Sequence, residues 1–100
     1  MAPEEFSTRQ LDRASLMLKA LAHPIRISIV RYLENGKKLT VTELHTLLNI
    51  EQSTTSHHLG ILKDKGILKS IRNGKNTYYF LKHSNLKQIV SCVATCTTDE

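Results

Sequence analysis

The sequence predicts a mainly α-helical fold with a two-stranded β-hairpin, a winged helix-turn-helix in the order α-α-α-α-β-β-α. Three observations predict it: capping boxes ahead of apolar stripes, two helical segments separated by three residues, and two β-prone runs around an Asn-Gly pair. The chain has 100 residues, of which 40% are hydrophobic, and this is enough for one core. Residues 1–100 are therefore expected to form a single domain.

The first two helices meet at a proline. A capping box at 7–10 and the apolar residues that follow it at helical spacing predict a helix over 8–22. Pro24 suits the first turn of a new helix and disfavours helix in the residue before it, so a second helix is expected to begin there. The Asn-Gly pair at 35–36 would end it. His23 is expected to be a hydrogen-bonded spacer between the two helices.

Residues 41–65 have the pattern of a helix-turn-helix. A second capping box at 40–43 opens a short third helix, which a tight turn at 49–51 follows. The fourth helix is expected over 52–65, with Gly66 just past its end. Its inward face would carry Thr55, Leu59 and Leu62, with His58 half-buried beside them.

Residues 67–81 are expected to form the hairpin, which is the wing of the fold. Asn73 and Gly74 would supply the positive φ angles that a type I′ turn requires. Strand alternation turns at least one of Tyr78 and Tyr79 toward the core. Core packing is therefore favoured for these rings over stacking on bases.

A last helix is expected over 84–97, with Ser84 as its N-cap, and it contains both cysteines. Cys92 and Cys96 are spaced i, i+4, which puts their Cβ atoms about 5 to 6 Å apart, whereas a disulfide needs about 3.5 to 4.5 Å. A bridge within the helix would therefore strain it. The pair is a candidate thiol sensor for an oxidant or a soft metalloid. The pattern favours the alternative, in which both are small apolar residues at a dimer seam.

The charge balance favours a polyanionic partner. Fourteen Lys and Arg against nine Asp and Glu give a formal net charge of +5, which suits nucleic acid or a membrane surface. The acidic start is unlike a signal peptide, and no apolar run approaches membrane-spanning length. Two cysteines are too few for a disulfide framework. A cytoplasmic protein without membrane attachment is expected.

The second helix of a helix-turn-helix enters the DNA major groove with its N-terminal residues near base edges. In this chain the candidates for base contacts are Gln52, Ser53, Thr54, Ser56 and His57. The candidates for backbone or minor-groove contacts are Lys63, Arg72, Asn73 and Lys75. The alternative is that the first group is only a solvated helix start and that the second is only a soluble edge.

Three segments together resemble the ArsR-type winged-helix repressors: LKALAHPIRISIVRYL at 18–33, VTELHTLLNIEQSTTSHHLGILKDKGIL at 41–68 and RNGKNTYYFL at 72–81. The resemblance implies a homodimer formed by the helices at 8–22 and 84–97. It also implies that the two reading helices occupy successive major grooves of a partly palindromic operator, and that an effector releases the repressor. Family members usually carry Ser where this chain has Glu51, so the cap of the reading helix is atypical.

No metal site, cofactor or catalytic site is expected. Where many sensors of this family carry a cysteine motif, the third helix offers only His45, and 84–97 contains no His, Asp or Glu. Adjacent helical residues such as His57 and His58 diverge by about 100° and do not converge on one substrate. The alternative to a sequence-specific DNA-binding repressor is therefore a winged-helix module that binds proteins and does not read DNA.

Overall fold

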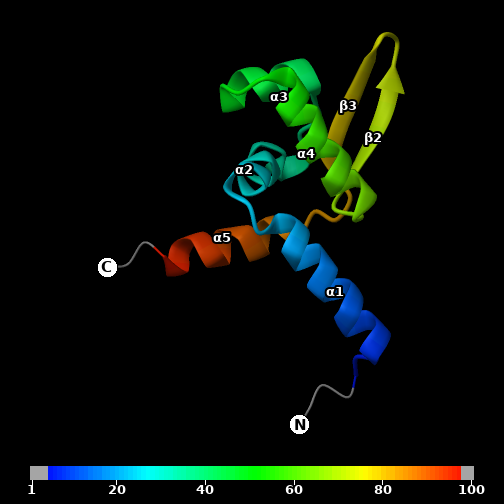
Figure 1. The fold of residues 1–100 in the computed structure, drawn as a ribbon, viewed down its shortest axis with the longest axis vertical. Coiled ribbons are helices and arrows are strands. Elements are labelled where there is room, and N and C mark those ends of the chain that lie inside the picture. The colour runs from blue at the N-terminus through cyan, green and yellow to red at the C-terminus, as the bar shows by residue number, and fades with distance from the viewer. Residues whose placement is uncertain (1–4, 98–100) are drawn as a thin grey trace.

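The computed structural model describes residues 5–97 and confirms the predicted fold class (Figure 1). The elements run in the order α1 (Thr8–Leu21), α2 (Pro24–Tyr32), the 3-10 turn η1 (Glu34–Gly36), β1 (Leu39–Thr40), α3 (Val41–Leu48), α4 (Gln52–Asp64), β2 (Leu68–Asn73), β3 (Asn76–Leu81) and α5 (Leu86–Cys96). The body of the molecule consists of α2, α3, α4 and the sheet, whereas α1 and α5 project from it as two arms.

Both predicted capping boxes form. The Ser7 hydroxyl accepts the Gln10 backbone N–H at 3.1 Å, and the Thr40 hydroxyl accepts the Glu43 N–H at the same distance. His23 confirms its predicted role, because its Nδ1 accepts the backbone N–H of Ile25 at 3.1 Å and so caps α2. These local contacts fix where α1, α2 and α3 begin.

The core lies where α2, α3, α4 and the start of β2 meet. Its fully buried apolar side chains are Ile29, Val30, Leu33, Leu44, Leu59, Leu62, Ile67 and Leu68. On α4 the predicted inward residues Thr55, Leu59 and Leu62 are all buried. Tyr79 packs against this core, as strand alternation predicts for at least one of the two tyrosines.

The sheet has three strands in the order β1-β3-β2, so the prediction of a two-stranded hairpin was incomplete. Leu39 and Thr40 pair with Tyr79 and Tyr78 immediately before α3 begins. β1 was missed because a strand of two residues is too short to show the alternation of apolar and polar residues that marks a strand. Thr40 was also assigned as the cap of the third helix.

The turn of the wing differs from the predicted type I′ turn. Asn73 pairs with Asn76, so the loop consists of Gly74 and Lys75. Of these four residues, only Gly74 has a positive φ, 67°. Glycine at the first central position is the requirement of a type II′ turn, and glycine takes this φ at lower cost than Asn73 would.

The N-cap of the last helix lies one residue later than predicted. Leu86 donates its N–H to the His83 carbonyl at 3.1 Å, which closes a turn ahead of α5. Asn85 takes the N-cap position and makes no side-chain capping bond, so the assignment of Ser84 as the cap was wrong.

One polar cluster lies between α2 and α4. His58 is 6% exposed and is therefore buried rather than half-buried. Arg26 donates from Nε to the Nδ1 of His58 at 3.1 Å, and the His23 ring lies 4.7 Å from the His58 ring between centroids. Burial lowers the pKa of His58 below 6.5, and the charges of His23, Arg26 and His57 lower it further.

This lowered pKa predicts that acid destabilises the fold through His58. Between the pKa of His58 in the folded state and 6.5, the unfolded chain binds more protons than the folded protein does. The stability that neutral His58 contributes is therefore fully present above pH 6.5 and is lost as the pH falls below it. One proton changes the free energy of unfolding by at most about 1.4 kcal/mol per pH unit. Urea unfolding from about pH 7.5 to 5.5 should show a smaller loss in His58→Asn than in the unaltered chain. Equal losses would contradict the assignment, since the variant keeps the other four histidines.

Candidate nucleic-acid interface

The first two turns of α4 have one face in the core and one in solvent. Thr55 donates its hydroxyl to the Glu51 carbonyl at 3.0 Å and, with His58, anchors the inner face. The five predicted base-contacting residues, Gln52, Ser53, Thr54, Ser56 and His57, are all exposed on the other face. A helix start held in this way can enter the DNA major groove, and the side chains that face the bases are then all short or polar.

The N-terminus of α4 carries the atypical cap that the sequence indicates. Glu51 takes the N-cap position with extended backbone, and its side chain makes no capping bond. The helix-start amides are therefore not occupied by this side chain, and backbone N–H groups at such a position can donate to a phosphate.

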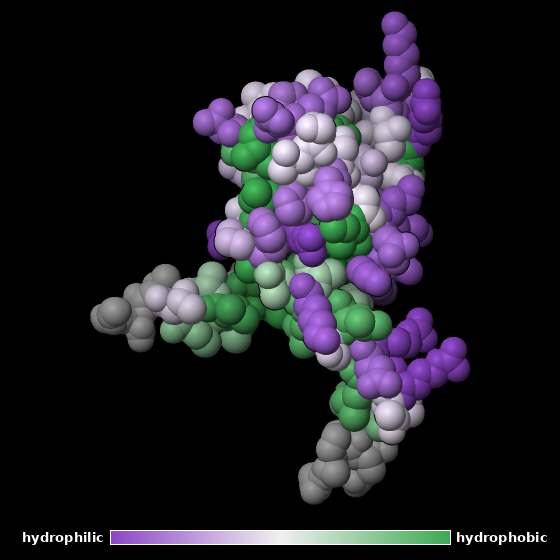
Figure 2. All heavy atoms as spheres, viewed as in Figure 1, coloured by the Kyte–Doolittle hydropathy of each residue, from purple (hydrophilic) through white to green (hydrophobic). Residues whose placement is uncertain are grey.

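The wing places cations at its tip. Arg72, Asn73 and Lys75 are exposed, and Arg72 donates from Nε to the Gly74 carbonyl at 3.2 Å. This bond holds the guanidinium beside the turn. Figure 2 shows hydrophilic residues gathered along the wing and hydrophobic residues gathered around α5. The polar and apolar surfaces thus lie on different parts of the molecule.

Lys63 does not join the base-contacting group. It is exposed, but it lies eleven residues after Gln52, about 16 Å further along the axis of α4. Its position suits a backbone phosphate rather than the base edges near the helix start. Lys38, which the sequence did not single out, lies over the Phe80 ring at 5.2 Å from the centroid. The pairing of β1 with β3 creates this contact, and no local motif predicts it.

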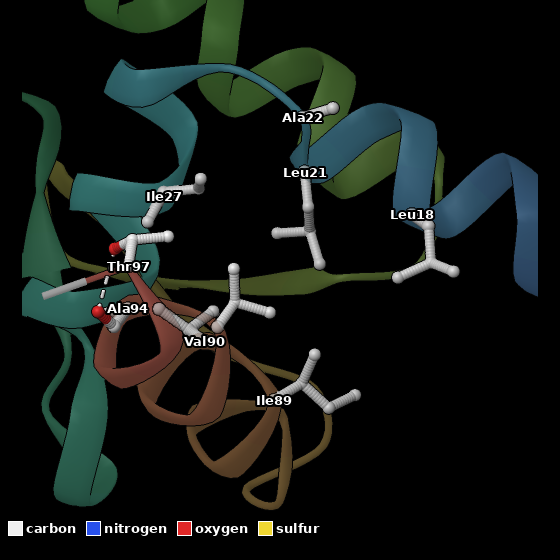
Figure 3. A pocket seen from close by; sticks show the side chains of 9 residues that line it. Leu18, Leu21, Ala22, Ile27, Ile89, Val90, Ala94 and Thr97 are labelled. Carbon is white, nitrogen blue, oxygen red and sulfur yellow. Dashed lines mark hydrogen bonds between the residues drawn. The ribbon is translucent and has the colours of Figure 1, made fainter. Parts of the chain in front are cut away.

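A second surface lies between the arms. An apolar hollow of about 380 Å³ opens between α1, α2 and α5 (Figure 3). It is lined chiefly by Leu18, Leu21, Ile27, Ile89, Val90 and Val93. Leu18 and Val93 are each 56% exposed, so the isolated chain leaves this surface in water. Such a contiguous apolar patch marks an interaction site.

The two cysteines are free thiols of α5, the helix that forms one wall of the hollow. Both are exposed on α5, neither lines the hollow, and Cys96 is the last residue of the helix. Within residues 5–97, no three His, Cys, Asp or Glu side chains are grouped so that they could hold a metal ion. In the same range, no helix combines the length and apolarity needed to cross a membrane.

Sequence comparison gives the family. The family described as "Bacterial regulatory protein, arsR family" matches this chain over residues 23–70, from the cap of α2 into β2. The chain is 35% identical over 102 residues to a biofilm growth-associated repressor of Xylella fastidiosa, covering 100% of this chain and 88% of that one. It is 38% identical over 80 residues to the transcriptional repressor PagR of Bacillus anthracis, covering 80% of each chain.

Solved structures agree in fold. The repressor BigR from Xylella fastidiosa superposes with a TM-score of 0.81 at 29% identity, covering 99% of this chain and 100% of that one. A homodimeric winged helix-turn-helix DNA-binding domain from Mycobacterium bovis superposes with a TM-score of 0.76 at 27% identity, covering 96% and 89%. These relatives are regulators and not enzymes. The sequence left open a DNA-binding repressor and a module that binds proteins, and the relatives support the DNA-binding repressor. The chain therefore belongs to the arsR family of bacterial regulatory proteins, as a DNA-binding transcriptional repressor with a winged helix-turn-helix fold.

Proposed function

We propose that the chain is a homodimeric, sequence-specific repressor that reads a partly palindromic operator with α4 and steadies itself on the DNA with the wing. The observation that carries the proposal is the exposed polar face of α4 beside a cationic hairpin tip. The chain acts on cellular DNA, so its proposed place of action is the cytoplasm.

The proposed role of each residue follows from its position and from the chemistry of its side chain. The proposed base contacts are those of Gln52, Ser53, Thr54, Ser56 and His57, whose side chains offer the donors and acceptors that major-groove edges recognise. The proposed phosphate or minor-groove contacts are those of Lys63, Arg72, Asn73 and Lys75. Phosphate contacts supply affinity for every sequence, whereas base contacts discriminate between sequences.

Arg72→Ala and Gln52→Ala should therefore act differently. Arg72→Ala should weaken binding to operator and random duplex alike and lower the slope of log affinity against log salt by up to about one unit. Gln52→Ala should cost about 1 to 3 kcal/mol on the operator and little on random duplex. Anisotropy titrations at several salt concentrations measure both effects. Arg9→Ala, an exposed cation of α1, is the control for net charge. A salt slope that Arg9→Ala lowers as much as Arg72→Ala does would refute the wing contact.

The proposed dimer interface is the apolar surface between α1 and α5. Leu18 on α1 and Ile89 and Val93 on α5 remain 45% to 56% exposed in one chain, although all belong to helical apolar stripes. A second copy of the chain would cover them, and the relative from Mycobacterium bovis is homodimeric. A two-fold dimer presents two reading helices to two half-sites, which is the reason for a partly palindromic operator.

Leu18→Asp and Val93→Asp should each disrupt the dimer. A carboxylate without a partner in an apolar interface should raise the dimer dissociation constant by at least about a hundredfold. Sedimentation equilibrium measures this constant. Leu47→Asp is the matched control, because Leu47 is 48% exposed on α3, away from the arms. If all three variants keep the dimer, the interface lies elsewhere.

For the effector, the proposed entry point is the cysteine pair. Both thiols are exposed, and Cys96 ends α5, so unwinding of the last turn would bring the two sulfurs within bonding distance without disturbing the rest of the helix. Hydrogen peroxide would convert the two thiols to a disulfide and release two water molecules. Arsenite is the corresponding soft ligand for the reduced pair.

Oxidation or arsenite should lower operator affinity in the unaltered chain and leave a Cys92→Ser, Cys96→Ser double variant unaffected. Anisotropy with reduced, peroxide-treated and arsenite-treated protein measures the effect, and nonreducing electrophoresis separates bridges within a chain from bridges between chains. Equal affinity under all conditions would make the cysteines structural.

A further inference from the structure

We propose that Arg26 and His58 are positioning residues for DNA reading: their hydrogen bond holds α4 against the junction of α1 and α2, and protonation of His58 releases it. This inference rests on the proposed reading role of α4. It adds acid sensitivity of operator binding, which arises inside the fold and not at the DNA surface.

Arg26 joins three segments of the chain. Its Nε donates to the Nδ1 of His58 on α4 at 3.1 Å, and its Nη1 donates to the Ala20 carbonyl in the last turn of α1 at 3.1 Å. Arg26 and His58 lie 32 residues apart in the sequence, and both contacts are at least partly buried. One side chain of α2 thus links the end of α1 to the middle of the reading helix.

In this hydrogen bond Arg26 can only be the donor and His58 only the acceptor. A guanidinium is always protonated and only donates, so the Nδ1 of His58 must accept and the ring must be neutral, with its proton on Nε2. A protonated His58 has no acceptor on Nδ1 and would place a positive charge against Arg26 at contact distance. Protonation therefore turns an attractive contact into a repulsive one.

Among residues 5–97, no acidic group is one of those that act on the charge of His58. The groups that act on it are His23 from the junction before α2, Arg26 from α2, and His57 from its own helix, and none of these is acidic. With burial they lower its pKa, so the neutral, accepting ring is the form present at neutral pH. Acid favours whichever arrangement returns His58 to water.

The position of His58 makes its displacement matter for DNA. His58 follows His57 directly and lies one helical turn after Thr54, and both of those residues face outward in the proposed base-contacting group. A helix is stiff over one turn, so movement of α4 at His58 shifts the outer side chains relative to the wing. Base contacts tolerate little misplacement, and affinity for the operator should suffer more than affinity for random DNA.

The test is the affinity of the protein for duplex DNA upstream of its own gene, and for a random duplex of equal length, from about pH 7.5 to 5.5 at constant ionic strength. His58→Asn keeps an acceptor near the position of Nδ1 but does not titrate. On going to acid, we expect the operator affinity of the unaltered chain to fall at least about threefold more than that of this variant. One proton can change the affinity by at most about tenfold per pH unit, so this fall lies within that limit. His83→Asn, an exposed histidine ahead of α5, is the matched control and should behave as the unaltered chain does.

A second variant and a spectroscopic measurement separate positioning from general stability. Arg26→Met keeps the packing of the stem but removes the donor, so it should weaken operator binding at neutral pH and show less acid sensitivity. Nitrogen NMR of the His58 ring in the unaltered chain should show an unprotonated Nδ1 at neutral pH. As that nitrogen titrates, the α4 amides should shift with the same midpoint.

The outcomes separate this inference from the proposed function. If the protein binds the operator specifically at neutral pH but the unaltered chain and His58→Asn lose affinity equally in acid, the inference is wrong and the reading role of α4 stands. A protonated Nδ1 at neutral pH, or α4 amides that do not follow the titration, would also overturn it. If Gln52→Ala leaves sequence preference unchanged, the reading role fails, and the inference fails with it.

Discussion

The packing of one face of α4 on the core is the constraint on which the rest of the structure depends. Leu59 and Leu62 are fully buried there, and Thr55 and His58 extend the same face toward the helix start. Because these residues take the inner face, the polar residues between them must point outward. The surface proposed to read DNA is thus a consequence of how the core is filled, and its orientation is as rigid as that core.

The arms obey a different constraint. A chain of this size has few neighbours to offer α1 and α5, and Figure 1 shows both helices leaving the body. Their apolar stripes are helical in spacing but only partly buried in one copy, and the hollow between them is lined almost wholly by aliphatic side chains. Burial of this surface by a second copy would supply stability that the isolated chain lacks. Assembly and two-fold DNA reading would then depend on the same apolar residues.

Features of the fold that depend on local sequence could be predicted, and features that depend on distant partners could not. Both capping boxes involve residues three apart, and Gly66 has the positive φ, 79°, expected just past a helix. By contrast, β1 exists only because β3 lies beside it, and the turn of the wing was set by how far the strands pair rather than by its Asn-Gly pair. The start of α5 is an exception, because the turn at 83–86 that precedes it is local and was not predicted.

The candidate site divides in the same way. Exposure of Gln52 and its polar neighbours follows from helical periodicity once the apolar face is recognised, so the sequence could place them. The contact of Arg26 with His58 spans 32 residues and involves two polar side chains that no apolar pattern marks. The sequence placed His58 near the inward face and His57 on the outer one, but it gave no sign that Arg26 is the partner of His58.

The two adjacent histidines of α4 lie in different surroundings. His57 faces solvent, on the side of the helix that is proposed to approach DNA. His58 faces Arg26, so a proton there opposes the contact that holds the helix in place. Rotation by about 100° between neighbouring residues is enough to produce this difference. Acid should therefore act on operator binding through the orientation of α4 at His58, and the affinity for random DNA, which depends on charge more than on orientation, should change less.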